Sequence, residues 1–142
     1  KLTPTIEVLM AQRRQILGRL ISQVELMSGA AELLQWLAEI NLPLGLGTSS
    51  EAEYVKRILE NLGIKNYFKV IVTGEDVAKG KPNPEVYLKV AAKLGVEPNE
   101  CLVIEDAPKG VAAAKAAGMA VVLIKARIAE ARKKLESVLG KQ

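Results

Sequence analysis

The chain has 142 residues, of which 49% are apolar and 25% charged, and its formal net charge is +4 at pH 7. This balance predicts one globular domain and excludes a disordered chain. The absence of histidine and the single Cys101 exclude histidine-based catalysis, zinc–thiolate clusters and an internal disulfide. Because no apolar run approaches about 18 residues and no signal peptide is recognisable, we expect a cytoplasmic protein with no membrane partner.

In chain order, the pattern predicts two helices and then strands that alternate with helices. Apolar residues recur at three- and four-residue spacing in the helical segments, and several of these segments end at a glycine. The predicted helices cover residues 2–24, 28–40, 50–62, 85–94 and 108–117, and a basic helix ends the chain. The predicted strands lie in LPLGLGTSS from Leu42, KVIVTG from Lys69, CLVIE from Cys101 and AVVLIK from Ala120.

Strands and helices that alternate at this spacing indicate βαβ units. We therefore predict an α/β fold with a Rossmann-like parallel sheet in three layers, covered by helices on both faces. Right-handed crossovers place the carboxyl ends of all strands at one edge of such a sheet, and ligands bind at that edge.

Polar side chains gather at the predicted carboxyl edge. Taken singly, each has a structural interpretation: the hydroxyls could cap a helix, the lysine could be solvated and the aspartate could cap the next helix. Taken together, a hydroxyl, a lysine and a carboxylate pair are the groups of a phosphate and Mg²⁺ site. The candidate residues are Thr48, Ser49, Ser50, Lys81, Glu105 and Asp106.

Three segments carry a resemblance to the haloacid dehalogenase superfamily, in its helical-cap phosphatase and β-phosphoglucomutase branch. They are GLGTSS, GKPNPEVY and VIEDAPKGVAAAKAAGM, and the likeness covers residues 28–124. The resemblance implies that Thr48 and Lys81 are catalytic residues that hold the phosphoryl group, helped by the backbone of Ser49 and Ser50. It also implies that Glu105 and Asp106 bind Mg²⁺, which offsets charge on the transferring phosphoryl oxygens.

One motif of the family is absent from the chain. The nucleophile and the general acid belong to an Asp-x-Asp motif on the first central strand, whereas the aspartates here are Asp76 and Asp106. The resemblance thus implies a core, residues 28–142, without its usual first central strand, and a remnant of a helical cap at 1–27. Three explanations stay open: a fragment of an active enzyme, completion by another chain, or a form without catalysis.

We therefore expect a domain of a Mg²⁺-dependent phosphohydrolase or phosphotransferase acting on small phosphorylated metabolites, inactive as this chain alone. The alternative is a non-catalytic, self-associating interaction module. Either way, we expect a homo-oligomer or a partner chain that supplies a strand, because open strand edges invite pairing. The basic tail favours a solvated helix face over nucleic-acid binding. Its positive charges are Arg127, Arg132, Lys133, Lys134 and Lys141, set against Glu130 and Glu136.

Overall fold

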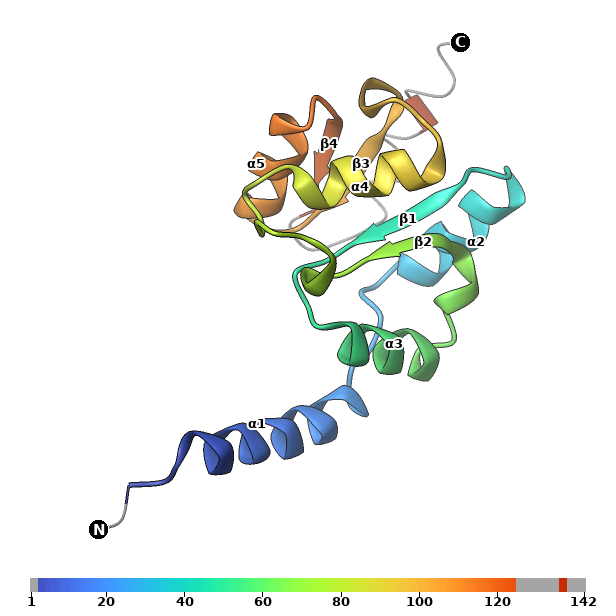
Figure 1. The fold of residues 1–142 in the computed structure, drawn as a ribbon. Coiled ribbons are helices and arrows are strands. Elements are labelled where there is room, and N and C mark those ends of the chain that lie inside the picture. The colour runs from blue at the N-terminus through green and yellow to red at the C-terminus, as the bar shows by residue number, and fades with distance from the viewer. Residues whose placement is uncertain (1–2, 125–135, 138–142) are drawn as a thin grey trace.

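The computed structural model describes residues 3–124 and 136–137 of the chain. Figure 1 shows the elements in order along the chain. The helices are α1 (Ile6–Ile21), α2 (Ala30–Glu39), α3 (Ala52–Asn61), α4 (Glu85–Leu94) and α5 (Pro108–Ala116). The strands are β1 (Leu44–Gly47), β2 (Phe68–Val72), β3 (Leu102–Glu105) and β4 (Ala120–Leu123). Short 3₁₀ helices are η1 (Lys65–Tyr67), η2 (Gly74–Asp76) and η3 (Pro98–Glu100).

The elements agree with the predicted order and type, and local chemistry explains their ends. The Thr5 hydroxyl accepts a hydrogen bond from the Val8 N–H and caps α1. Gly95 and Gly118 follow α4 and α5 with φ of 74° and 76°, the left-handed conformation that ends many helices. The positive charges of the predicted basic helix lie outside the described residues.

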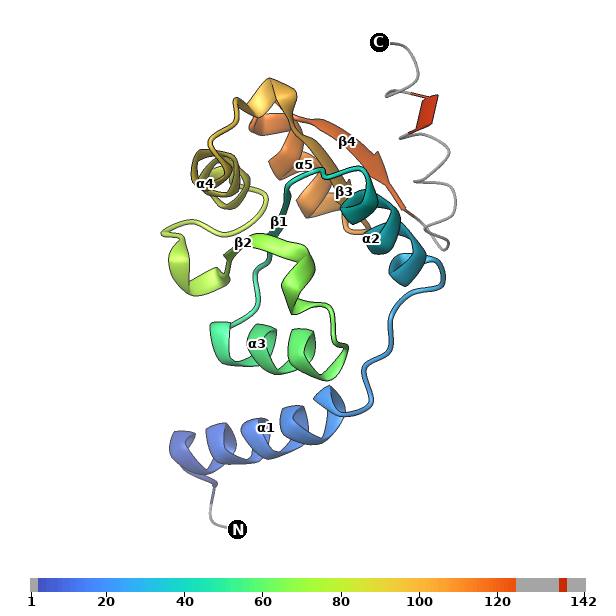
Figure 2. The same ribbon diagram turned by 90° about the vertical axis from the view of Figure 1, so that its right-hand side faces the viewer.

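The strands are parallel, as predicted, but they form two separate pairs. β1 pairs with β2, and β3 pairs with β4. Figures 1 and 2 place β1 and β3 as the inner strands, and no backbone pairing joins them among the described residues. In the described chain, β1 and β3 are therefore not paired directly with each other.

Helices shared by both strand pairs hold them in one domain. α4 packs closely on β1, where Gly45 lies against Val90. On the other face, α2 contributes Leu33 and Leu37 to a cluster with residues of both pairs. These partners include Leu44 of β1, Leu102 and Ile104 of β3, and Val122 of β4. The α/β architecture, with helices on both faces of parallel strands, is therefore confirmed.

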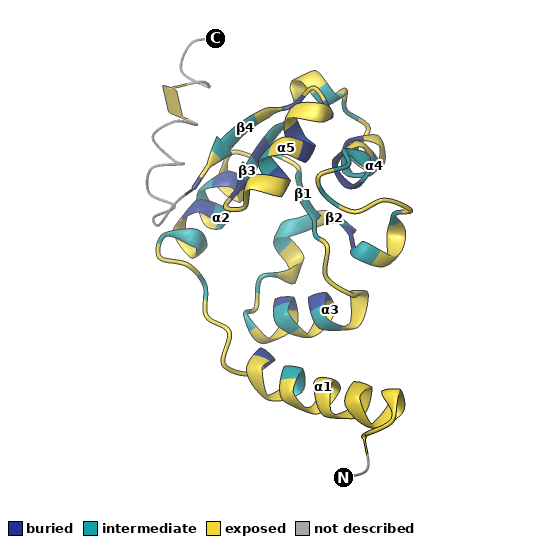
Figure 3. Cartoon of the chain, turned by 90° about the vertical axis from the view of Figure 1, so that its left-hand side faces the viewer, coloured by how far each residue is buried: buried dark blue, intermediate teal, exposed yellow. Residues whose placement is uncertain are grey.

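α1 extends away from the sheet, and Figure 3 shows that most of its residues are exposed. Its end near Ile21, which is buried, packs toward α3. Arg13 also pairs with Glu51 at 2.9 Å. The proposed boundary between 1–27 and 28–142 stays a prediction. In the parts of the chain that the structure describes, no helix has the length and apolar character needed to span a membrane.

Candidate functional site

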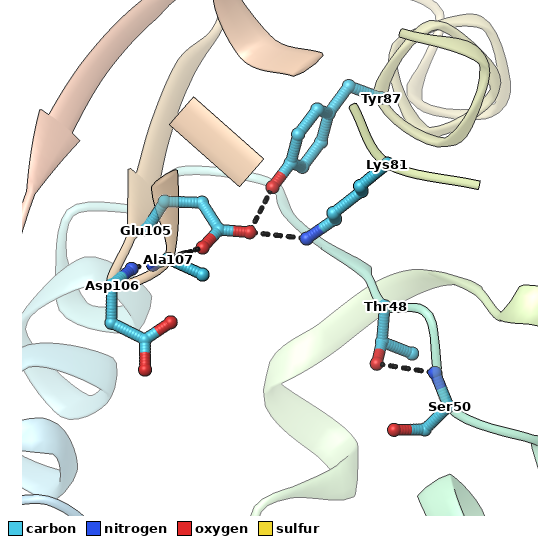
Figure 4. Close-up of polar contacts among 7 residues, drawn as sticks. All are labelled: Thr48, Ser50, Lys81, Tyr87, Glu105, Asp106 and Ala107. Carbon is cyan, nitrogen blue, oxygen red and sulfur yellow. Dashed lines mark hydrogen bonds and ion pairs between the residues drawn. The ribbon is translucent and has the colours of Figure 1, made fainter. Parts of the chain in front are cut away.

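Glu105, at the carboxyl end of β3, is the centre of a buried polar cluster. Its side chain is 9% exposed, and its oxygens accept four hydrogen bonds (Figure 4). Lys81 Nζ and the Tyr87 hydroxyl donate to Oε1, the second at 2.5 Å. The N–H groups of Asp106 and Ala107 donate to Oε2 at 3.0 and 3.1 Å. The carboxylate is therefore fully satisfied and held in one orientation.

Lys81 comes from the loop before α4, and that loop is anchored by Glu85. The two carboxylate oxygens of Glu85 accept the N–H groups of Ala78 and Lys79, both at 3.0 Å. An ion pair with Lys89, together with these backbone bonds, lowers the pKa of Glu85 to about 2. Glu85 thus stays ionised and keeps the loop closed, which positions Lys81.

Charge states in the cluster follow from burial and from these contacts. Burial alone would raise the pKa of Glu105, but the hydrogen bonds from Lys81 and Tyr87 outweigh it and hold that pKa below its usual value. Burial, and then the Glu105 carboxylate, raise the pKa of Tyr87. Lys81 Nζ also lies 4.7 Å from the centroid of the Tyr87 ring. At neutral pH the cluster is therefore an ion pair with a neutral hydroxyl donor.

Gly110 of α5 allows this arrangement. A Cβ at position 110 would lie 2.0 Å from the Glu105 carboxyl carbon. No side chain fits there unless the carboxylate or the helix moves. The close approach explains why a glycine, which otherwise lowers helix stability, stands in the first turn of α5.

Asp106 differs from its neighbour, because its side chain is exposed. Figure 4 shows its carboxylate directed away from that of Glu105. The first turn of α5 has no side-chain cap, so the alternative in which Asp106 caps this helix is wrong. Its oxygens make no hydrogen bond or ion pair within residues 3–124 and 136–137, and they are available to a ligand.

The carboxyl end of β1 presents hydroxyls in an exposed turn. Thr48 Oγ1 accepts the Ser50 N–H at 3.1 Å, and Ser50 O accepts the Gly74 N–H at 2.9 Å. Ser49 and Ser50 are exposed. Ala52 has the first N–H of α3, and it donates instead to Glu75 Oε1 at 3.3 Å. Thr48 therefore shapes its own turn and does not cap α3.

Asp76, the other aspartate of the chain, has a structural role at the end of β2. Its Oδ2 accepts the N–H and the hydroxyl of Thr73 at 2.7 and 2.8 Å. These bonds lower the pKa of Asp76, and the bond from the Thr73 backbone has the larger effect. Because its carboxylate closes the turn of η2, Asp76 is not poised as a substitute nucleophile.

A sequence model of the haloacid dehalogenase-like hydrolase family matches residues 2–124, most of the chain. The chain belongs to this family. It is 44% identical over 91 residues to validoxylamine A 7'-phosphate phosphatase of Streptomyces hygroscopicus subsp. limoneus, covering 64% of this chain and 43% of that protein. It is 40% identical over 108 residues to the β-phosphoglucomutase of Bacillus subtilis, covering 76% of this chain and 47% of that one.

Solved structures agree with this haloacid dehalogenase-like assignment. The fold matches the crystal structure of a HAD phosphatase from Thermococcus onnurineus with a TM-score of 0.71 and 32% identity, covering 78% of this chain and 52% of that one. The chain thus spans about half the length of these relatives. The resemblance drawn from the three sequence motifs is confirmed at the level of the family.

In the structure of this haloacid dehalogenase-like chain, some of the predicted site residues lie together and others do not contact them. Lys81, Glu105 and Asp106 come together at the end of β3, whereas no hydrogen bond links Thr48, Ser49 or Ser50 to them in the described parts of the chain (Figure 4). Sequence reasoning missed Tyr87 and Gly110. The signal for Tyr87 was a hydroxyl on the buried face of a helix, which needs a polar partner. Gly110 had no signal beyond being a glycine inside a helix.

The oxygen donors at this edge are chemically suited to Mg²⁺. That ion takes one or two protein carboxylates and completes its shell with water and substrate phosphate oxygens. Asp106 offers a free carboxylate, while Glu105 is occupied by Lys81 and Tyr87. Within the described residues no cluster of three or more potential metal-ligating His, Cys, Asp or Glu side chains occurs. The donors fit an ion shared with a phosphate rather than a site closed by protein ligands.

Proposed function

We propose that this chain binds the phosphoryl group of small phosphomonoesters together with Mg²⁺, as part of an enzyme that hydrolyses or transfers that group. The observation that carries the proposal is the buried Lys81–Glu105 pair beside the free Asp106 carboxylate. Lys81 supplies a positive charge, and Asp106 supplies the oxygens a hard cation prefers. The names of two relatives, a sugar-phosphate mutase and a phosphatase, agree with this substrate class.

In this proposal each predicted site residue has a distinct task. Lys81 and the Thr48 hydroxyl hold the phosphoryl oxygens, assisted by the exposed Ser49 and Ser50 turn. Asp106 binds Mg²⁺ directly. Glu105 keeps Lys81 in place and completes the negative charge around the ion. The metal, when bound, neutralises charge that builds on the transferring phosphoryl oxygens.

A cavity next to the β1 turn provides room for the rest of a small substrate. It measures about 340 Å³ and lies between α1 and α3. Its lining combines apolar side chains with Ser49, Ser50, Tyr54 and the Arg13–Glu51 ion pair. This volume is at the lower end of the range for small-molecule sites, about 300 to 1,000 Å³. We propose a reducing, cytoplasmic setting for the protein, in keeping with its single cysteine.

The proposal predicts phosphate binding without turnover by the 142-residue chain. The printed sequence contains no Asp-x-Asp, the motif that the family resemblance assigns to the nucleophile. Titration calorimetry should detect inorganic phosphate only when Mg²⁺ is present. Asp106→Asn should weaken this binding about tenfold or more, because a neutral amide replaces the metal carboxylate.

The matched control is Glu53→Gln, which removes an exposed carboxylate from the first turn of α3. It should bind phosphate as the parent chain does. Equal binding by the parent and by Asp106→Asn, with or without Mg²⁺, would exclude this metal and phosphate site. Turnover of an aryl phosphate that is lost in Asp106→Asn would keep the site but contradict the predicted inactivity.

The split between β1 and β3 also favours the second candidate function, an interaction module that engages another polypeptide. Phosphate binding and strand binding involve different groups. The two functions are therefore compatible in one chain and can be tested separately.

A further inference from the structure

The turn between β1 and α3 is held by the segment that follows β2. Three hydrogen bonds join the two segments: Thr48 N–H to Val72 O at 3.0 Å, Gly74 N–H to Ser50 O at 2.9 Å, and Ala52 N–H to Glu75 Oε1 at 3.3 Å. The last two lie beyond the paired residues of the strands. The position of the turn therefore depends on the loop after β2 as well as on the sheet.

Gly74 brings the two backbones into close contact. A Cβ at position 74 would lie 2.5 Å from the carbonyl oxygen of Ser49 and 3.0 Å from its carbonyl carbon. Because these are backbone atoms, a side chain at position 74 would displace the turn itself rather than a flexible side chain. The glycine thus allows the loop after β2 to fix where Ser49 lies.

Glu75 does for α3 what an N-cap residue usually does. The residue at the N-cap position, Glu51, makes no side-chain cap and pairs instead with Arg13. Glu75 is the middle residue of η2, and that short helix is closed by the bonds from Thr73 to Asp76. Its carboxylate therefore reaches the helix from a neighbouring strand, 23 positions along the chain, and satisfies one of the free N–H groups at the helix start.

The turn held in this way carries the groups that the proposed function assigns to the phosphoryl oxygens. Thr48 Oγ1 accepts the Ser50 N–H (Figure 4), whereas the Ser49 N–H donates no hydrogen bond among the residues that the structure describes. Ser49 and Ser50 also line the cavity between α1 and α3. A shift of the turn would therefore move a hydroxyl, a free N–H and the wall of the cavity together.

The charge of Glu75 acts against phosphate binding, which makes its position the informative property. An exposed carboxylate beside the turn repels a phosphate anion. If Glu75 acted through its charge alone, its removal would strengthen phosphate binding. If Glu75 acts by holding the turn, its removal weakens binding. The two roles thus predict changes of opposite sign.

We propose that Glu75 is a positioning residue, which together with Gly74 holds the turn so that the Thr48 hydroxyl and the Ser49 N–H reach the same phosphoryl group. Glu75 acts through the Ala52 N–H and does not touch the ligand. The inference rests on the proposed function. Small displacements of binding groups are costly, because donors that miss the phosphoryl oxygens no longer stabilise their charge.

Titration calorimetry with inorganic phosphate and Mg²⁺ tests this role. Glu75→Ala should weaken phosphate binding about tenfold, although it removes a repelling charge. Glu75→Gln keeps an oxygen that can accept the Ala52 N–H and should bind at least as tightly as the parent chain. Glu53→Ala is the matched control, because it removes an exposed carboxylate of the same helix turn that accepts no hydrogen bond in the described chain. It should not weaken binding.

A second variant changes the position of the turn and leaves the charge as it is. Gly74→Ala should also weaken phosphate binding, since its methyl group displaces the Ser49 carbonyl. Gly18→Ala in α1 is the control, because its nearest neighbours, the guanidinium nitrogens of Arg57, lie at an ordinary contact distance of 3.8 Å. Thermal unfolding of all variants establishes that they are folded.

Amide hydrogen exchange measures the position of the turn without any ligand. In Glu75→Ala, exchange of the Gly74 amide should become about tenfold faster, because its bond to Ser50 loosens with the turn. Exchange of the Thr48 amide, which is bonded to Val72 of β2, should not change. Glu75→Gln should exchange as the parent chain does.

Several outcomes would overturn the inference. Equal or tighter phosphate binding by Glu75→Ala would leave only its charge, and equally weak binding by Glu75→Gln would mean that the accepting oxygen is not what matters. Unchanged exchange of the Gly74 amide in Glu75→Ala would mean that Glu75 does not hold the turn. A parent chain that binds no phosphate would overturn the proposed function as well, whereas a parent that binds as Glu75→Ala does would overturn the role of Glu75 alone.

Discussion

The carboxyl ends of β3 and β1 differ in how completely their site residues are held. At the end of β3, Glu105 is buried and receives four hydrogen bonds from the loop, α4 and its own turn. At the end of β1, the Thr48 hydroxyl accepts a single hydrogen bond among the described residues, from the Ser50 N–H, and Ser49 and Ser50 are exposed. One end is therefore organised before a ligand arrives, whereas the other depends on what binds there.

This difference has a physical cause. A buried carboxylate needs a partner for every oxygen, so burial of Glu105 brings a lysine, a tyrosine and two backbone donors with it. A half-buried hydroxyl such as that of Thr48 remains accessible to water and needs less support. Mutations at the end of β3 should therefore mainly lower the free energy of unfolding, whereas mutations at the end of β1 should mainly weaken ligand binding.

The largest effect on stability is expected from Lys81→Met. Lys81 and Glu105 are 14% and 9% exposed, and removal of the lysine leaves a buried charge without its counter-ion. We expect a loss of about 3 kcal/mol in the free energy of unfolding, measured with urea. Lys79→Met, an exposed lysine of the same loop, should change it by less than about 0.5 kcal/mol. Similar losses for the two variants would show that the pair is not a stabilising contact.

Gly110→Ala should have the next largest effect. The added methyl group would overlap the Glu105 carboxyl group, and the repacking should lower the free energy of unfolding by about 2 kcal/mol. Gly80→Ala is the control, because no atom lies within 4 Å of that position. In a Glu105→Ala background, the loss caused by Gly110→Ala should shrink, since the clashing group is gone. An unchanged loss in that background would place the clash elsewhere.

A smaller effect is expected from mild acid. The folded pKa of Glu105 lies below its unfolded value near 4.5, so the unfolded chain takes up the proton first as the pH falls. The stabilisation from Glu105 is thus complete above about pH 4.5 and is lost as the pH falls through the lower, folded pKa. Glu85, with a pKa of about 2, contributes in the same direction between 4.5 and 2.

Urea unfolding between pH 7 and pH 3 measures this effect. Glu105→Gln should flatten the acid limb of the profile, because it removes one of the three carboxylates whose pKa values are lowered in the folded chain. A parallel profile for the parent and the variant would assign the acid sensitivity to Glu85 and to Asp76, whose pKa is also lowered.

Prediction from sequence succeeded where a local rule applies. The span 85–94 was predicted for α4, which begins at Glu85 and ends before Gly95, because a glycine in the left-handed conformation ends the helix. α1 is shorter than the predicted 2–24, since its cap at Thr5 sets the start. Lys81 and Glu105 were both expected at the sheet edge, but their direct ion pair and the shared Tyr87 were not, because spacing along a chain does not predict which side chains meet.

The sequence by itself determined the α/β alternation, the parallel strands, the family and the residues available for phosphate and metal chemistry. The alternation of elements follows from turn residues and apolar periodicity, which are local properties, whereas the family and the roles of the site residues came from the resemblance of three motifs. Only the tertiary structure decided that Glu105 is a buried partner of Lys81 while Asp106 stays free, and that β1 and β3 remain separate. Those outcomes depend on which groups far apart in the chain share a buried space, where each carboxylate and each strand edge requires a partner.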